Sequence, residues 1–432
     1  MTILMWGTLW LQTGRWDFWA AAPKPAAYFD DARAVVTLVG ALALGTTVWT
    51  AIRAQTVNER RFESEEDSRK SSRERERAQD RRARFSTGSE QLSSDSPAAR
   101  IAAVYALATL ADEFAEDSDA DGQQNCVDVL CAYVRLTPSA SHVVATTQPV
   151  AATASSGDDL NARAEVEIHR AIFGMIRQRC TDKIDVGIRW TNKRFDFRGA
   201  RLTDVDLSGL LLEHASLIDF SDAAFDGHLD LSGGRWEAGD ILLERTAFTA
   251  GSRLDLTDTT IDGGAVRLYP KSFKRSYVRA LRLRVISGSL RVVCDDVHST
   301  QISMENARFE GGTSVVELRL QERAHLRLAR VQVRGLLHLR LNMRERTSTR
   351  LQHPYIGGKG RIRFELTILQ AFSFLEITAP RGSEDATIQV DKPQFNGGVL
   401  RLRGLAGSGT PVVRLGSGNS PIGDVDLVSN KL

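Results

Sequence analysis

The sequence has little cysteine, almost no excess of charge and few long apolar runs. Four cysteines in 432 residues, with no tight pair, are too few for a disulfide framework and fit a reducing compartment. Lysine and arginine total 56 against 54 acidic residues, so the chain as a whole makes no case for a nucleic-acid binder or an acidic DNA mimic. A hydrophobic content of 42% excludes a polytopic transporter, and 25% charged residues with 34 glycines exclude collagen and wholesale disorder.

Enzyme signatures are also missing. The sequence contains no glycine-rich phosphate loop with a lysine, no GxSxG and no HExxH, and its eight histidines occur singly. Cys126 and Cys131 have a spacing that fits neither a zinc knuckle nor a two-plus-two zinc pattern, so buried thiols are the better interpretation. Asp295 and Asp296 are the one adjacent pair of aspartates in the long repeats and a weak signal for glycosidic chemistry. We expect no enzyme, no cofactor and no metal.

One apolar run stands out, at residues 34–52. It carries no charge between Arg33 and Arg53 and is long enough to cross a hydrocarbon layer of about 30 Å. Eleven basic residues follow between 53 and 84, against three before the run, and the positive-inside rule then places the C-terminal bulk in the cytoplasm. We predict a single transmembrane helix over 34–52 in the cell membrane, with a buried core helix as the alternative.

The run is flanked by two different segments. Residues 1–33 are rich in tryptophan and lack the basic start of a signal peptide, so we expect no cleaved leader. This segment is either an amphipathic helix in the membrane interface or a flexible apolar tail. Residues 53–92 interleave acids with arginines at helical spacing, which predicts a charged helical stalk, with a disordered linker as the alternative.

Residues 93–190 have the pattern of a small α-helical module. A helix is predicted to begin at Ser93–Pro97, where a capping side chain precedes a proline, and its apolar residues recur every three to four positions up to Phe114. A second amphipathic stretch surrounds Cys126, and a third helix is predicted over about 161–179. Residues 137–160 are rich in Ser, Thr, Ala and Pro and read as an unstructured linker.

A five-residue period begins at residue 195 and indicates a β-solenoid over 195–430. A large apolar residue returns every five positions and is expected to stack inward, at Phe197, Leu202, Leu207, Leu212 and Leu217. A longer unit follows, in which an apolar anchor precedes a glycine and an alternating strand. These later anchors are spaced about one coil apart at positions 261, 286, 309, 333 and 356; none is found near 380, and a further one is at 395. We expect the glycines to supply positive-φ corners. An irregular β-sandwich is the alternative.

Three strings carry a resemblance to a known family. They are RFSTGSEQLSSD (Arg84–Asp95), RIAAVYAL (Arg100–Leu107) and VLCAYVR (Val129–Arg135). Together with the preceding apolar run and the first repeats, about residues 34–265, they resemble actinobacterial membrane-anchored pentapeptide-repeat proteins. The resemblance implies a right-handed quadrilateral β-helix and no defined activity.

Charge divides along the predicted solenoid. Residues 195–265 hold 14 acids and 5 bases, whereas residues 266–363 hold 21 bases and 7 acids. A possible phosphate-binding patch consists of Lys271, Lys274, Arg275, Arg279, Arg282 and Arg284. The same residues can equally be the solvated face of strands whose other face is buried.

The expected function is therefore architectural. We expect a membrane-anchored, cytoplasm-facing β-solenoid scaffold that binds a protein partner and catalyses no reaction. The alternative is a membrane-tethered binder of nucleic acid or anionic lipid through the arginine-rich coils 266–363.

The membrane orientation is open to a direct test. A reporter fused after Leu432 is expected to behave as a cytoplasmic protein, because the basic flank follows the apolar run. If a reporter fused at this position is active only in the periplasm or outside the cell, both the predicted orientation and the predicted reducing compartment are contradicted.

Overall fold

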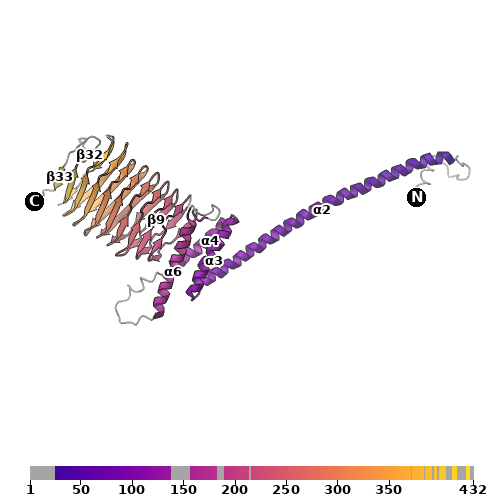
Figure 1. Ribbon diagram of the computed structural model, residues 1–432, viewed down its shortest axis with the longest axis horizontal. Helices are drawn as coiled ribbons and strands as arrows, with labels where there is room; N and C mark the ends of the chain where they lie inside the picture. The colour runs from indigo at the N-terminus through magenta and orange to yellow at the C-terminus, as the bar shows by residue number, and fades with distance from the viewer. Residues whose placement is uncertain are drawn as a thin grey trace. The chain divides into compact units, whose positions relative to one another are not determined.

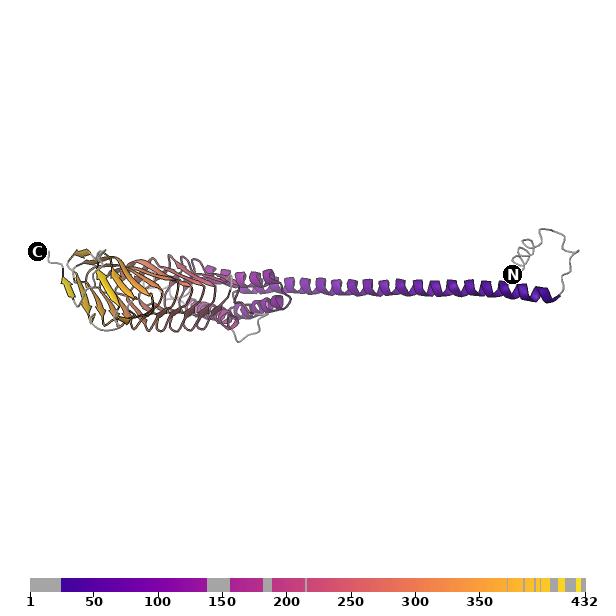
Figure 2. The same cartoon turned by 90° about the horizontal axis from the view of Figure 1, so that it is seen from above.

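A computed structural model describes residues 25–137, 156–181, 189–213, 216–370, 372–383, 385–391, 394–396, 398–404, 411–415 and 425–428. Among these residues, four helices precede a run of short strands that stack into a β-solenoid (Figures 1 and 2). The predicted mainly-β solenoid is confirmed. Residues Arg81–Leu432 form one unit and Met1–Asp80 another.

The first helix, α2, runs from Pro25 to Leu92. It covers both the predicted membrane run and the predicted stalk, and it begins inside the segment predicted as the tryptophan-rich start. Residues 1–24 lie outside the described residues. Within the part of the chain that the structure describes, no helix combines the length and the apolar character that a membrane crossing requires.

Three helices form the module. α3 spans Pro97–Glu116 with Ser96 as its N-cap residue, close to the predicted start. α4 spans Ala120–Leu136, and the Asp119 carboxylate at its N-terminus accepts a hydrogen bond from the backbone N–H of Gly122 at 2.8 Å. α6 spans Ser156–Arg179 and begins within the predicted linker. Residues 138–155 of that linker lie outside the described residues.

The solenoid has three parallel sheets, named here A, B and C. Sheet A contains fifteen strands: β1 (Arg194–Asp196), β2 (Arg201–Leu202), β5 (Leu217–Asp219), β6 (Ala224–Phe225), β9 (Asp240–Glu244), β10 (Ala247–Phe248), β13 (Ala265–Tyr269), β14 (Ser272–Lys274), β17 (Ser289–His298), β20 (Thr313–Gln321), β23 (Leu336–Met343), β26 (Arg361–Gln370), β29 (Thr387–Val390), β30 (Gln394–Asn396) and β32 (Val412–Leu415).

Sheets B and C complete each coil. Sheet B has ten strands: β3 (Val205–Asp206), β7 (His228–Asp230), β11 (Arg253–Asp255), β15 (Tyr277–Arg279), β18 (Gln301–Glu305), β21 (His325–Ala329), β24 (Ser348–Gln352), β27 (Phe374–Thr378), β31 (Val399–Arg403) and β33 (Val425–Val428). Sheet C has eight: β4 (Leu211–Leu212), β8 (Arg235–Trp236), β12 (Thr260–Ile261), β16 (Arg284–Val285), β19 (Arg308–Phe309), β22 (Gln332–Val333), β25 (Tyr355–Ile356) and β28 (Arg381–Gly382). Among the described strands only β33 runs antiparallel to its neighbour.

The coils change shape along the solenoid. In the first coils one side is built from two short strands, such as β13 and β14. Both of these strands pair with the single ten-residue strand β17, which carries a bulge between Cys294 and Val297. The later long strands β20, β23 and β26 each take the place of two short strands in the same way. Each early coil therefore has four short strands, and each of these later coils has three strands.

The predicted five-residue period holds for one coil and then slips. Phe197, Leu202, Leu207 and Leu212 are all buried, as predicted. Leu217 is only half-buried, so its predicted inward position is wrong. β5 pairs with β1 so that Leu217 lies beside the exposed Arg194, and the inward positions pass to Ile218 and Phe220. Phe220 stacks on Phe197 with ring centroids 5.2 Å apart.

The later anchors are placed in part as predicted. Ile261, Phe309, Val333 and Ile356 are buried in sheet C. Val285, rather than the predicted Ile286, fills the intervening position, because the strand register pairs it with Ile261.

The two irregular anchors near the C-terminus have simple explanations. The position near 380 is held by Gly382, which pairs with Ile356, so the anchor is a glycine rather than an apolar side chain. Phe395 lies in β30 and pairs with Leu369 of sheet A, so it does not continue the sheet C series.

The repeated glycines have two explanations. The predicted positive φ is confirmed at Gly227, Gly251, Gly263, Gly312 and Gly358, whereas close packing of the backbone explains Gly264 and Gly288. A Cβ on Gly264 would meet the backbone O of Gly239 at 2.3 Å, and one on Gly288 would meet the backbone O of Gly264 at 2.3 Å. Gly312 does have a φ of 68°, but Gly264 and Gly288 do not lie in the left-handed region. The predicted reason is therefore wrong at these two positions, because successive coils approach too closely there for any side chain.

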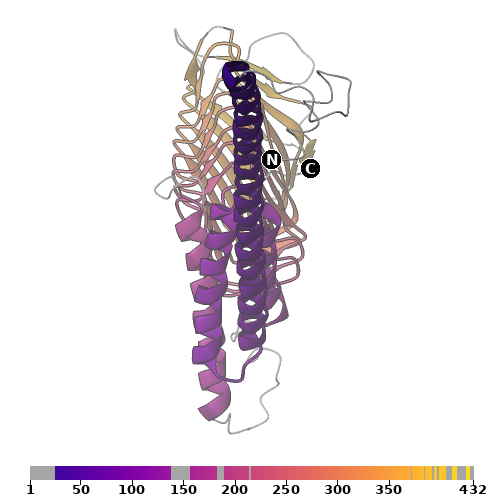
Figure 3. The ribbon, with the colours of Figure 1, turned by 90° about the vertical axis from the view of Figure 1, so that its right-hand side faces the viewer.

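The helical module covers the N-terminal end of the solenoid (Figure 3). Phe173 of α6 packs on Phe197 of the first coil with ring centroids 5.0 Å apart. Arg135 of α4 binds Asp196 at 2.7 Å, and Arg177 of α6 binds Asp206 at 2.6 Å. These contacts shield apolar side chains that the first coil would otherwise expose, which is the role of a capping unit in repeat proteins.

Two glycine-to-alanine substitutions should change stability in opposite directions. Gly288→Ala forces a Cβ against backbone and is expected to lower the free energy of unfolding by about 1–3 kcal/mol. Gly174→Ala, in α6, meets no atom within 4 Å and should raise it by about 0.5–1 kcal/mol through helix propensity. Thermal unfolding followed by circular dichroism measures both. Equal melting temperatures for the two variants would contradict the close-packed corner.

Candidate anion-binding groove

Several acidic residues of the first coils accept hydrogen bonds within the turns between strands. Five aspartates each accept a hydrogen bond from the backbone N–H two residues later: Asp196 (3.1 Å), Asp206 (3.0 Å), Asp219 (2.8 Å), Asp230 (2.9 Å) and Asp255 (2.9 Å). Such side-chain bonds stabilise turns that leave a strand. Part of the acidity of residues 195–265 therefore has a local structural use.

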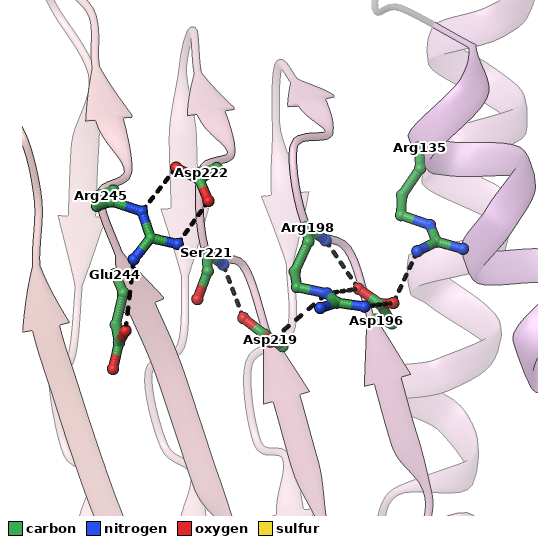
Figure 4. Close-up of polar contacts among 8 residues, drawn as sticks. All are labelled: Arg135, Asp196, Arg198, Asp219, Ser221, Asp222, Glu244 and Arg245. Carbon is green, nitrogen blue, oxygen red and sulfur yellow. Dashed lines mark hydrogen bonds and ion pairs between the residues drawn. The ribbon is translucent and has the colours of Figure 1, made fainter.

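Ion pairs then connect one coil to the next (Figure 4). Arg198 binds Asp196 at 2.8 Å and reaches Asp219 of the following coil at 3.8 Å. Arg245 binds Asp222 of the preceding coil at 2.6 Å. Each exposed pair contributes little stability, but a row of them holds the outer side chains in fixed positions.

The six residues of the predicted phosphate patch lie on one coil but on different sides of it. Lys271 and Lys274 flank or end β14 of sheet A, Arg279 ends β15 of sheet B, and Arg284 begins β16 of sheet C. Arg275 and Arg282 occupy the corners between these strands, with φ values of 50° and 55°. The coil therefore distributes the six charges around its circumference.

Most of this charge is also compensated. Four of the six residues form ion pairs: Lys271 with Asp222 (4.0 Å), Lys274 with Asp296 (3.6 Å), Arg282 with Asp258 (2.5 Å) and Arg284 with Glu310 (2.8 Å). In the described part of the chain, Arg275 and Arg279 have no carboxylate partner.

A denser basic surface lies on sheet C. Two adjoining hollows of about 210 and 360 Å³ share Arg284, Arg308 and Gln332 in their walls, and we call them together the sheet C groove. The remaining lining residues are Arg282, Asn306, Phe309, Glu310 and Arg334. The lining of the groove thus contains four guanidinium groups and one carboxylate.

Strand register creates this surface. From β8 onward the first residue of each sheet C strand faces outward, and pairing places Arg284, Arg308, Gln332 and Tyr355 in one column. A second outward column follows the buried residues of the same strands and contains Glu310, Arg334 and Gly357. The corner before these strands adds Arg282 and Arg330, which are exposed.

The arginines differ in their partners. Arg284 donates from Nε to Glu310 at 2.8 Å and from Nη2 at 3.3 Å. Arg308 and Arg334 are exposed and have no carboxylate partner among the described residues. The hydrogen bond from Arg284, together with the nearby charges of Arg334 and Arg308, holds the pKa of the Glu310 carboxyl below its usual range. The Glu310 carboxylate therefore stays negatively charged among the arginines of the groove.

Other clusters of titratable residues show no comparable arrangement. His298 contacts Asp296 through one ring nitrogen and Glu322 through the other, at 3.3 Å, beside the bulge of β17. Asp295 pairs with Arg319 at 3.8 Å. Within the described ranges, no group of three or more His, Cys, Asp or Glu side chains has the arrangement of a metal site.

All four cysteines are buried, which confirms the prediction of buried thiols for Cys126 and Cys131. Burial raises the pKa of Cys126 to about 12 and that of Cys294 to about 11, and it raises those of Cys131 and Cys180 further. All four thiols stay protonated near neutral pH, where a protonated thiol is a poor nucleophile and a poor metal ligand.

The sequence prediction missed part of this groove. Arg308 was not among the predicted patch residues, although it is one coil after Arg284. The spacing of the repeat is the signal that could have predicted that these two residues are neighbours.

Comparison with known proteins finds no matching family model, no matching curated protein and no matching solved structure.

The position of Glu310 is testable by titration. Arg284→Gln removes the strongest contact to this carboxyl, so its pKa should rise toward the ordinary value of about 4.3. Because the folded-state pKa is lowered, the ion pair stabilises the fold at neutral pH and loses this contribution as the pH falls through that pKa. Carbon-13 NMR of glutamate-labelled protein measures the change. Arg282→Gln, which breaks the neighbouring pair with Asp258, is the control and should shift Glu310 much less.

Proposed function

We propose that this protein is a membrane-anchored, cytoplasm-facing scaffold whose β-solenoid binds a protein partner along the sheet C groove. The observation that carries the proposal is the pair of exposed guanidinium groups, Arg308 and Arg334, which lie in a hollow beside Glu310 and have no carboxylate partner in the described part of the chain. Arginine is a frequent anchor of protein interfaces because its planar fork binds carboxylates in two places.

Rigid side chains support a binding role. Arg340 on sheet A lies between Glu317 at 3.4 Å and Glu365 at 3.0 Å, which belong to the coils on either side. Charged side chains fixed in this way lose little conformational entropy when a partner binds. On sheet A, ion pairs between coils therefore preorganise part of the outer surface.

Membrane anchoring is supported by α2. The charge-free run 34–52 includes exposed apolar side chains such as Leu44 (68% exposed) and Trp49 (59% exposed), and a basic flank follows it. The resemblance of Arg84–Asp95 and Val129–Arg135 to membrane-anchored pentapeptide-repeat proteins favours the same placement. We also propose that the coils are right-handed, as parallel strand connections almost always are.

Binding of nucleic acid or anionic lipid is the second candidate function. It is favoured by the five arginines that three successive coils present at sheet C and its corner: Arg282, Arg284, Arg308, Arg330 and Arg334. Phosphate binding depends on such clusters and weakens with salt.

Retrieval of the full-length tagged protein from membranes, with and without nuclease, tests the proposal. A protein partner should remain bound after nuclease treatment and be lost from the double variant Arg308→Gln/Arg334→Gln. Arg235→Gln is the matched control, because this residue lies in the same outward column but pairs with Glu237 at 2.9 Å. Loss of the partner on nuclease treatment would favour the second function, and recovery of the protein only in the soluble fraction would contradict anchoring.

A further inference from the structure

We infer that the partner binds through an extended acidic segment, with two carboxylates held by Arg308 and Arg334. This inference rests on the proposed function and specifies the chemistry of the partner.

The neighbouring arginines show what the groove binds. Arg282 donates from Nε and Nη2 to both carboxylate oxygens of Asp258, each at 2.5 Å. Arg284 uses the same two nitrogens for Glu310. In both cases the acid belongs to an adjacent coil, so this surface forms a ladder in which an arginine of one coil binds a carboxylate of the next coil or the one before.

The ladder stops at the next two arginines. Arg308 is followed in its column by Gln332, which is neutral. Arg334 lies between Glu310 of the preceding coil, whose carboxylate is hydrogen-bonded to Arg284, and Gly357 of the following coil, which has no side chain. The position diagonal to Arg308, where Glu310 stands relative to Arg284, is occupied by Arg334, so among the described residues neither arginine has a carboxylate of its own. A partner can supply the missing carboxylates.

Glu310 favours a peptide over a polyphosphate chain. Its side chain lines the same hollow as Arg284, Arg308 and Arg334. A nucleic-acid backbone carries a charge on every unit and would bring a phosphate toward this carboxylate. A peptide can place a neutral residue there and keep its acids for the two arginines.

The spacing also suits an extended chain. Arg308 and Arg334 belong to neighbouring coils, about 4.8 Å apart, and to outward columns about 6.7 Å apart, so their backbones are separated by about 8 Å. Alternate side chains of a strand are about 6.7 Å apart, and long arginine side chains cover the difference. Tyr355, 48% exposed, lies next to Gln332 and offers a hydroxyl donor. The predicted motif is acid-x-acid.

The test uses full-length protein in mild detergent and a short fluorescein-labelled peptide of alternating glutamate and serine, read by fluorescence anisotropy. The wild type should bind it, and the glutamine-serine peptide should bind at least about tenfold more weakly. Arg308→Gln and Arg334→Gln should each weaken binding about tenfold or more. Arg235→Gln should bind like the wild type.

A nearly isosteric variant tests the ladder itself. Gln332→Glu supplies Arg308 with an internal carboxylate, so it should weaken peptide binding to the same extent as Arg308→Gln while leaving the melting temperature unchanged or higher. Unchanged binding by Gln332→Glu overturns the inference. So does the absence of peptide binding, or tighter binding of oligothymidylate than of the peptide with the same dependence on Arg308.

The outcome separates the two proposals. If the peptide fails to bind while a nuclease-resistant partner is still retrieved, the proposed scaffold function is retained and the inference of an acidic partner segment is wrong. If the peptide binds but no protein partner is retrieved, the groove is acid-binding and the proposed scaffold function is wrong.

Discussion

The rest of this structure depends on one constraint: equivalent residues of successive coils stack on one another. Parallel backbone pairing places each buried residue over its counterpart, as in the aromatic series Phe225, Phe248 and Phe273, whose ring centroids lie 5.1 and 5.0 Å apart. The same register brings backbone against backbone at Gly264 and Gly288, where no side chain fits. A shift of one residue would expose the apolar side chains and bury the charged ones, so the register is strongly specified.

A fixed register also organises the outer surface. Residues that lie far apart in sequence become neighbours in a column, and their charges pair between coils, as Arg340 does with Glu317 and Glu365. The acidic first half uses its carboxylates for turns and for contacts to the helical cap. The basic second half has fewer acids to pair with, and this imbalance leaves Arg308 and Arg334 available on sheet C.

Much of the fold could be predicted from the sequence. The start of α3, the inward series from Phe197 to Leu212 and most sheet C anchors follow from local periodicity and capping, which depend on neighbouring residues. Less of the candidate site could be predicted. The six predicted basic residues are sequence neighbours, and the coil separates them onto different sides, whereas Arg284 and Arg308 meet only because the strands pair.

The sequence by itself determined that the chain is a parallel repeat protein preceded by helices, that its charge divides along its length and that Cys126 and Cys131 are buried thiols. Only the tertiary structure decided that Leu217 turns outward, that Gly382 completes the sheet C series and that Gly264 and Gly288 are glycines because of close approach. It also decided which arginines share a groove. The physical reason is that periodicity reports which side of a strand is buried, while contacts between coils depend on the register that only backbone pairing sets.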